Sequence, residues 1–309
     1  MRVCVITPLL NAMKHIDSLI SGIRTNSIID YNVLFIDSSS TDSTITSLEE
    51  AKLDYHIISR CDFDHGSTRQ LGVDLRPADI YVFLTQDSIL ANSDSIKNIV
   101  DCFKDPSVGV AYGRQLPHKN ANPIAAHHRL FNYPDKSYIR SFDDRYKYGI
   151  KTCFNSNSFS AYRASALKEI GGFPVKNIVG EDVVVVAKML KLGWKVNYCS
   201  SSKVYHSHNY TIMQEFKRYF DIGVFHKRQN WLVEDFNSPN KEGFKFIKSE
   251  FGYLLKNKKY YWILKSIFVN LFKFLGYKLG CNYCKIPNFL RLKFSMHKGF
   301  WVSPKALKP

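Results

Sequence analysis

The sequence predicts an α/β protein with a mostly parallel central sheet flanked by helices and a helical, basic extension at its C-terminal end. Short apolar segments alternate with amphipathic ones through the first two thirds of the chain, which is typical of repeated strand–helix units. Polar residues gather where the predicted strands end, and beyond residue 210 only helical periodicity remains. We therefore expect a main domain at residues 1–230 and an extension at residues 231–309.

Five strands are predicted in the first part of the chain, with helices between them. The strands cover residues 3–7, 32–37, 55–58, 80–85 and 108–113, and the helices lie near residues 14–24, 42–52, 67–75 and 93–103. The fourth strand is continuously apolar, as expected of a strand covered by helices on both faces. Right-handed crossovers then bring the carboxyl ends of the strands to one edge of the sheet, where such folds bind ligands.

The second part of the main domain is predicted to be less regular. Residues 138–157 are expected to form an irregular connection, followed by a strand at 159–163 and a helix at 164–170. Another helix is predicted over residues 181–192, with Gly193 as its stop and a strand at 195–199 after it. Glu181 and Asp182 would then lie at the positive end of a helix dipole.

Three predicted strand ends carry polar side chains that are able to bind a ligand. Pro8 and Asn11 follow the first strand, Asp37 ends the second, and Gln86 and Asp87 follow the fourth. The polar residues 39–42 are explained equally well as the cap of the next helix. Asp37 precedes that cap and needs another role.

The placement of two carboxylates suits the transfer of a sugar from a nucleotide diphosphate. This reaction needs a cation to neutralise the leaving diphosphate and, if the anomeric centre inverts, a carboxylate to deprotonate the acceptor hydroxyl. Asp87, at the tip of a buried strand, is placed for a hard cation with oxygen ligands. Asp182, at a helix start after a glycine-bounded loop, is placed for the base.

Several motifs occur together in a characteristic order. They cover residues 6–12, 35–42, 64–72, 84–87, 113–117, 156–163, 180–182 and 204–211. With these motifs the chain resembles, over about residues 1–230, the inverting family 2 glycosyltransferases of GT-A fold. The segments His65-Gly66-Ser67-Thr68-Arg69 and Arg114-Gln115-Leu116-Pro117 are similar to those of bacterial rhamnosyltransferases of O-antigen and capsule assembly.

This resemblance implies roles for individual residues. Thr7 and Pro8 would line the nucleotide pocket, Asp37 would bond the pyrimidine base, and Arg69 would lie on the nucleotide side. Other expected contacts to substrate or nucleotide are Asn11, Gln86, Asn157 and Glu181.

The resemblance implies a site for a divalent cation, Mg²⁺ or Mn²⁺, with Asp87 as a ligand. The family more often has two acids at this strand end, and here Thr85 replaces the first of them. A further ligand is therefore expected from elsewhere, and His206 or His208 could supply it, because the two lie on one face of an extended segment. The same histidines could instead be structural or bond the acceptor.

The implied function is the transfer of L-rhamnose from dTDP-rhamnose to a lipid-linked saccharide, with inversion, in the synthesis of O-antigen or capsular polysaccharide. Processive relatives carry a Gln-x-x-Arg-Trp motif, which Gln214, Arg218 and Tyr219 do not reproduce, so a non-processive enzyme is expected. One alternative is a family 2 transferase that uses a UDP-sugar such as N-acetylglucosamine, galactose or glucose. Another is a non-catalytic scaffold of a polysaccharide assembly complex.

The net charge of +16 is concentrated in the extension, where residues 241–309 hold 15 Lys and Arg against Glu242 and Glu250. Nucleic acid is not the expected partner, because the main domain is nearly neutral and carries acids at its strand ends. Residues 260–279 form a predicted helix whose polar arc includes Lys265, Ser266 and Lys273. The opposite apolar face predicts an interfacial membrane helix, with Trp301 as a further anchor. Packing on the main domain or in a homodimer is the alternative.

The cellular location follows from cysteine usage and from the N-terminal residues. Seven scattered cysteines are typical of reduced thiols, and Met1 leads directly into a strand without a signal-peptide pattern. We expect a cytoplasmic protein bound peripherally to the cytoplasmic face of the inner membrane.

Overall fold

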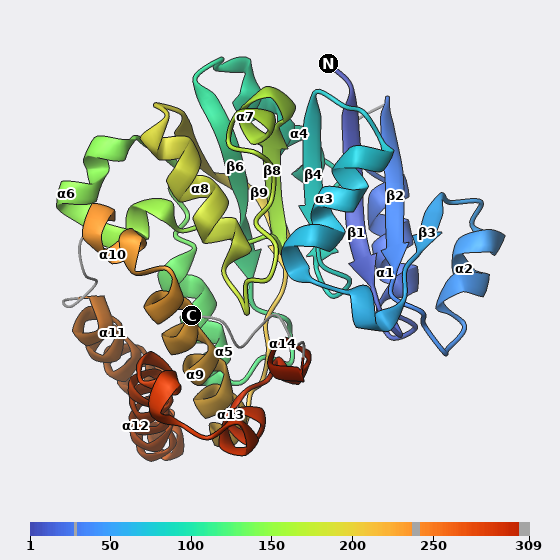
Figure 1. Cartoon of the computed structure of the whole chain (residues 1–309). Helices are drawn as coiled ribbons and strands as arrows, with labels where there is room; N and C mark the ends of the chain where they lie inside the picture. Colours follow the sequence, from blue (N-terminus) through green and yellow to red (C-terminus); the bar gives the residue numbers. More distant parts are fainter. Residues whose placement is uncertain (28–29, 237–241, 303–309) are drawn as a thin grey trace.

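A nine-stranded sheet forms the centre of the computed structural model, which describes residues 1–27, 30–236 and 242–302 (Figure 1). The strand order is β3-β2-β1-β4-β8-β6-β9-β5, and β7 pairs with β9. The strands are β1 (Val3–Leu9), β2 (Tyr31–Asp37), β3 (Tyr55–Ile57), β4 (Ile80–Leu84), β5 (Ile89–Leu90), β6 (Val108–Leu116), β7 (Tyr138–Arg140), β8 (Phe159–Arg163) and β9 (Lys195–Tyr205).

The sheet is mostly parallel, as the sequence predicts. Strands β1, β2, β3, β4, β6 and β9 run in one direction, and β5, β7 and β8 run in the other. Strand β8 lies antiparallel between β4 and β6. The start of β8 therefore lies at the same edge of the sheet as the carboxyl ends of its neighbours.

Helices cover both faces of the sheet. They are α1 (Ile16–Arg24), α2 (Thr44–Glu50), α3 (His65–Leu75), α4 (Ser95–Asp101), α5 (Pro123–Asn132), α6 (Arg145–Tyr148), α7 (Ala164–Glu169), α8 (Glu181–Lys191), α9 (Ile212–Arg228), α10 (Asn230–Phe236), α11 (Glu242–Lys256), α12 (Tyr260–Cys281), α13 (Asn288–Phe294) and α14 (Lys298–Val302). Helices α1 and α4 pack on one face, and α8 and α9 contribute to the core of the other. Strand β4 between these cores is fully buried, which explains its unbroken apolar sequence.

The bounds of two predicted segments need correction. The segment 138–157 is not irregular throughout, because it contains β7, α6 and two short 3-10 helices. These elements are too short to produce a recognisable period. The strand predicted at 195–199 continues to Tyr205, because its pairing with β6 shifts register at Gly113 and Arg114 and then resumes. This continuation carries the chain to His206.

The C-terminal extension is attached through helices α9 and α12, which pack at backbone contact. A Cβ on Gly276 would lie 2.3 Å from the carbonyl oxygen of Phe216, and one on Gly280 would lie 2.0 Å from that of Phe220. Neither distance is sterically possible without movement of the helices. The predicted boundary near residue 230 would assign α9 and α12, which are in tight contact, to different domains. The division into two domains stays a prediction.

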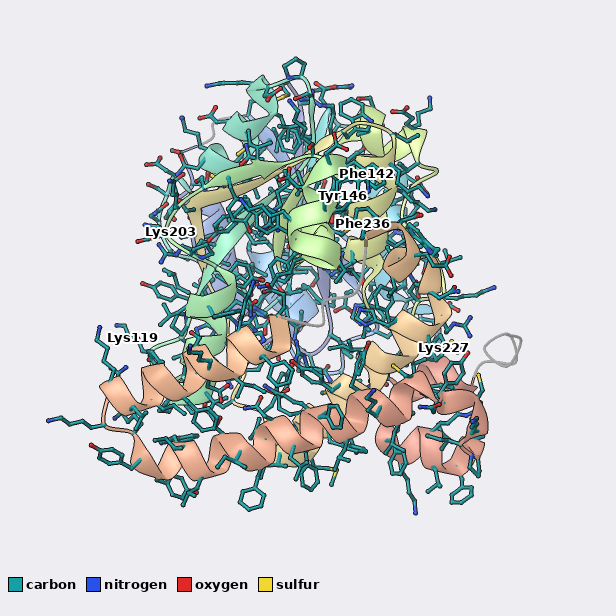
Figure 2. All side chains as sticks on the ribbon, turned by 90° about the vertical axis from the view of Figure 1, so that its left-hand side faces the viewer. Lys119, Phe142, Tyr146, Lys203, Lys227 and Phe236 are labelled. Carbon is teal, nitrogen blue, oxygen red and sulfur yellow. The ribbon has the colours of Figure 1, made fainter. Side chains whose placement is uncertain are left out.

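Helix α12 turns its polar arc toward the protein and its apolar face outward. Ser266 and Lys273 are buried, and Glu250 of α11 accepts a hydrogen bond from Ser266. The exposed large side chains are Tyr260, Tyr261, Leu264, Ile267, Phe268, Leu271, Phe274, Leu275 and Leu279. Figure 2 shows α12 along the lower edge of the molecule, with side chains pointing away from it. Among the described residues, no helix is both long and apolar enough to cross a bilayer.

Trp301 does not extend this exposed face. It is 1% exposed and lies against Phe220, Tyr283 and Phe300. The prediction that Trp301 anchors the chain to a membrane is therefore wrong. The sequence shows only that Trp301 lies near the end of the chain, and not that α14 folds back onto α9.

We predict that Gly280→Ala lowers the free energy of unfolding by about 1–3 kcal/mol, because the added methyl group would force α12 away from α9. Urea unfolding followed by circular dichroism measures this change. The matched control is Gly252→Ala in α11, where a Cβ meets nothing within 4 Å and the substitution should be neutral or stabilising. Equal effects of the two substitutions would contradict the packing described here.

Candidate functional site

Polar side chains from distant parts of the sequence meet at one edge of the sheet. The carboxyl ends of β1, β2, β4 and β9 lie there, together with the start of β8. Helix α8 begins beside this edge, since its Asp182 accepts a hydrogen bond from the backbone N–H of Asn157, just before β8. The edge therefore brings the predicted metal ligands and the predicted base into one site.

Asp87, His206 and His208 form a group with the chemistry and spacing of a metal site. Their nearest possible ligand atoms all lie within 4.8 Å of one another. Nε2 of His206 is 3.4 Å and Nε2 of His208 is 3.6 Å from Oδ2 of Asp87. The sequence left open which histidine joins Asp87, and the structure brings both to it. One carboxylate and two imidazoles suit a divalent transition metal and leave coordination positions for other oxygen ligands.

The protonation states of these three residues favour cation binding. Burial would raise the pKa of Asp87, but in the acidic range where Asp87 titrates the histidines are protonated, and the hydrogen bond and charge of His206 and the charge of His208 hold this pKa well below its usual range. Burial lowers the pKa of His206, and burial together with His206 lowers that of His208 to about 4. At neutral pH the group thus offers an ionised carboxylate and two neutral imidazoles.

Gln115 at the end of β6 orients the buried histidine. Nδ1 of His206 donates to Oε1 of Gln115 at 2.9 Å, which places the ring proton on Nδ1 and leaves the Nε2 lone pair facing Asp87. The same Oε1 accepts from Arg129 at 2.8 Å, and Nε2 of Gln115 donates to Ser156. Residues 113–117 form a motif that is recognisable in the sequence, but the motif implies no role for Gln115. The partners of Gln115 come from other segments of the chain, so its role in orienting His206 could not be predicted from the sequence.

Asp182 is held at the start of α8 as a partly buried carboxylate. Its Oδ1 accepts from the N–H of Val183 at 2.8 Å, and its Oδ2 accepts from the N–H of Asn157 at 3.2 Å. Burial, followed by the negative charge of Glu181, raises the pKa of Asp182 to about 7. A carboxylate with a pKa near the working pH is well matched to accepting and releasing a proton.

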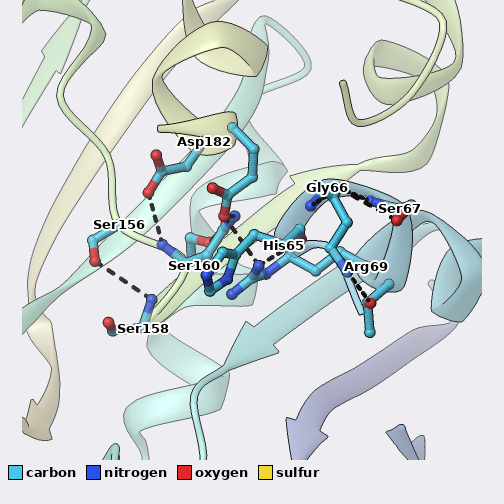
Figure 3. A network of polar contacts seen from close by, with 12 residues as sticks. His65, Gly66, Ser67, Arg69, Ser156, Ser158, Ser160 and Asp182 are labelled. Atoms are coloured by element: carbon cyan, nitrogen blue, oxygen red, sulfur yellow. Dashed lines mark hydrogen bonds and ion pairs between the residues drawn. The ribbon is translucent and has the colours of Figure 1, made fainter. Parts of the chain in front are cut away.

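A buried ion pair lies beside Asp182 (Figure 3). Nη1 of Arg69 is 3.0 Å from Oε1 of Glu181, and the two side chains are 4% and 8% exposed. The same Oε1 accepts from Nδ2 of Asn157, whose Oδ1 accepts from Ser160 and Tyr162. Predicted contacts of Arg69, Asn157 and Glu181 with a substrate stay predictions. In this structure these side chains hold α3, β8 and α8 together.

The predicted nucleotide residues lie at the ends of β1, β2 and β4. Asp37 is buried and accepts from the N–H and hydroxyl of Ser40. Asn11, in a left-handed conformation with φ of 48°, accepts from the N–H of Thr41, and Gln86 bonds both backbone groups of Leu10.

These bonds join three strand ends into one rigid rim. Thr7 is buried within it, and Pro8, next in β1, is half-buried. Within the described part of the chain, the buried hydroxyls of Thr7 and Ser38 have no hydrogen-bond partner.

The chain matches one protein family and is similar to two curated proteins. Residues 4–171 match the glycosyl transferase family 2. O-antigen chain rhamnosyltransferase RfbN of Salmonella typhimurium is 46% identical, over 97% of this chain and 96% of its own length. O-antigen chain rhamnosyltransferase WbaN of Salmonella anatum is 44% identical, over 87% of this chain and 85% of its own length.

Solved structures with a similar fold are more distant in sequence. A mannosyltransferase from Pyrobaculum calidifontis, in complex with GDP-Man and Mn²⁺, has a TM-score of 0.61 at 14% identity and covers 89% of this chain and 86% of its own. TarS of S. aureus in complex with UDP-GlcNAc has a TM-score of 0.54 at 13% identity, covering 82% and 73%. These similarities confirm the predicted fold.

We predict that His206→Ala abolishes tight binding of Mn²⁺, because it removes one of three converging ligands. Gln115→Leu should weaken binding by about 10–100-fold, because His206 then lacks the acceptor that orients its ring. Isothermal titration calorimetry measures both effects, with His56→Ala on the exposed surface of β3 as the control. Unchanged Mn²⁺ affinity in His206→Ala would show that the cation binds elsewhere.

Proposed function

The chain belongs to glycosyl transferase family 2, and on this premise we propose the donor, the acceptor and the residues of its reaction. The protein is a rhamnosyltransferase of O-antigen synthesis, as the 46% identity to RfbN over nearly its whole length supports. We propose that it moves L-rhamnose from dTDP-rhamnose to a lipid-linked saccharide, with inversion at the anomeric carbon. The proposed mechanism is supported by one observation: Asp182 and the group of Asp87, His206 and His208 lie at the same edge of the sheet.

Asp182 is the proposed general base. Its carboxylate takes the proton of the acceptor hydroxyl while the acceptor oxygen forms a bond to the anomeric carbon of rhamnose. The bond from that carbon to the diphosphate of the donor breaks in the same step, so the configuration inverts. The two backbone N–H groups that bond Asp182 fix its direction, and the raised pKa makes its ionised form a stronger base than an ordinary aspartate.

Asp87, His206 and His208 are the proposed ligands of the metal. A divalent cation bound there would neutralise the negative charge that develops on the departing diphosphate. Two imidazoles beside one carboxylate favour Mn²⁺ over Mg²⁺, because Mg²⁺ prefers oxygen ligands only.

The rim formed by β1 and β2 is the proposed nucleotide pocket. The unpartnered hydroxyls of Thr7 and Ser38 suit polar groups of a nucleotide. Asp37 would face the pyrimidine base after exchanging one of its bonds to Ser40.

The exposed face of α12 is the proposed contact with the cytoplasmic side of the inner membrane. Its apolar side chains are continuous along the helix, and exposed lysines at 256, 258 and 259 precede it. Apolar burial at the headgroup boundary combined with attraction of lysines to anionic lipid is the usual basis of peripheral binding. A homodimer that covers the same face is the competing arrangement.

We predict that Asp182→Asn lowers kcat about 10²–10⁴-fold, because the amide cannot accept the proton. In the wild type, kcat/KM should rise with pH up to about 7 and then level off, since only ionised Asp182 acts as a base. Initial rates with dTDP-rhamnose and a lipid-linked saccharide, measured between pH 5 and pH 9, test both statements.

The control for this experiment is Asp135→Asn, an exposed carboxylate in the loop before β7. Full activity of Asp182→Asn would rule out Asp182 as the base. Faster turnover of UDP-N-acetylglucosamine, UDP-galactose or UDP-glucose than of dTDP-rhamnose would contradict the proposed donor. A wild type that transfers no sugar from any of these donors would favour a scaffold.

We predict that the double substitution Phe268→Glu and Leu271→Glu reduces binding to phosphatidylglycerol vesicles at least tenfold, because each apolar side chain contributes about 1.5–3 kcal/mol when buried. Vesicle sedimentation measures this binding. Leu192→Glu, an exposed apolar residue after α8, is the matched control. A wild type that ignores vesicles but forms a dimer, which the double substitution dissociates, would favour the subunit contact.

A further inference from the structure

A pocket lies between the group of Asp87, His206 and His208 and the exposed face of α12. Its walls come from α5, the segment after β9, α9 and α12, and it is open to solvent. His208 of this group lines one part of it, and Trp262 and Lys265 of α12 line another. The pocket therefore extends from the site of sugar transfer to the helix that carries the exposed apolar face.

The pocket carries an excess of positive charge. Arg129, Arg218 and Lys265 line it, with Glu215 as the acidic residue of the lining. Glu215 is already occupied, because its oxygens lie 3.4 Å from Nη1 of Arg218 and 3.5 Å from Nζ of Lys273. Within the described ranges, Arg129 and Lys265 form no salt bridge. Nη1 of Arg129 bonds the neutral Gln115, and Nζ of Lys265 lies 4.5 Å from the ring centre of Trp262.

Two cations without carboxylate partners are costly to hold in a partly buried pocket. Burial lowers the pKa of Arg129, and the charge of Arg218 acts in the same direction. A bound anion would relieve both the desolvation and the repulsion between these guanidinium groups. Guanidinium and ammonium groups together are the usual partners of phosphate oxygens.

We propose that this pocket binds the phosphate or diphosphate that links the acceptor saccharide to its lipid, with Arg129, Arg218 and Lys265 as the cationic contacts. The inference rests on the proposed function, because it assumes a lipid-linked acceptor. The order of chemistry along the pocket matches that of such a molecule. The apolar chain would leave along α12, the anion would lie among the three cations, and the saccharide would point past His208 toward Asp182.

Two synthetic acceptors with the same saccharide test this proposal. One joins the saccharide to an alkyl chain through a diphosphate, and the other joins it through an uncharged linker. We expect Lys265→Met to raise KM for the diphosphate acceptor about tenfold, while KM for the donor and the rate with the uncharged acceptor stay unchanged. Lys265→Arg should restore most of the affinity. Lys278→Met, an exposed lysine of α12 that does not line the pocket, is the control.

A higher KM for dTDP-rhamnose in Lys265→Met would assign the pocket to the donor diphosphate and overturn the proposal. Equal losses with both acceptors would indicate a general membrane effect and overturn it as well.

A readout independent of catalysis is the fluorescence of Trp262 during titration with inorganic pyrophosphate in the presence of EDTA. A change in the wild type that is absent in Trp262→Phe and weaker in Lys265→Met supports the anion site, even if no rhamnose is transferred. No change in the wild type would contradict it.

Discussion

The ion pair between Arg69 and Glu181 determines how the two halves of the site face each other. Arg69 belongs to α3, which follows β1, β2 and β3, and Glu181 begins α8, which carries Asp182. Two opposite charges in a dry interior tolerate little displacement, because separating them would leave each charge buried without a partner. Asn157 adds a third fixed point from the start of β8. The position of Asp182 relative to the strand ends follows from this constraint.

The same ion pair shapes the chemistry of Asp182. Burial and the negative charge of Glu181 raise its pKa, whereas Arg69 and the two backbone N–H groups oppose that rise. The balance is a carboxylate that changes protonation near neutral pH. The pKa of Asp87 shifts in the opposite direction, because His206 and His208 favour its ionised form despite its burial. Two partly buried aspartates thus acquire opposite pKa shifts from their immediate neighbours.

Helix α12 connects this chemistry to the surface of the molecule. Its polar arc is buried by contacts with α9 and α11, and the close approach at Gly276 and Gly280 fixes which face remains outside. An ordinary surface helix buries its apolar face, and the opposite arrangement in α12 is the basis of the proposed membrane contact. The cationic pocket lies between that surface and His208, so Trp262 and Lys265 of the extension line the same pocket as a residue of the candidate site.

The sequence by itself determined the alternation of strands and helices, the polar strand ends, and the choice of Asp87 and Asp182 as candidate site residues. These features depend on local periodicity and on motifs that are contiguous in the chain, and the family comparisons confirm the family and fold they indicate. Only the tertiary structure decided that both histidines join Asp87, that Gln115 orients His206, and that Trp301 is buried. Each of these depends on strand pairing or helix packing between segments far apart in sequence, for which a single sequence contains no distance information.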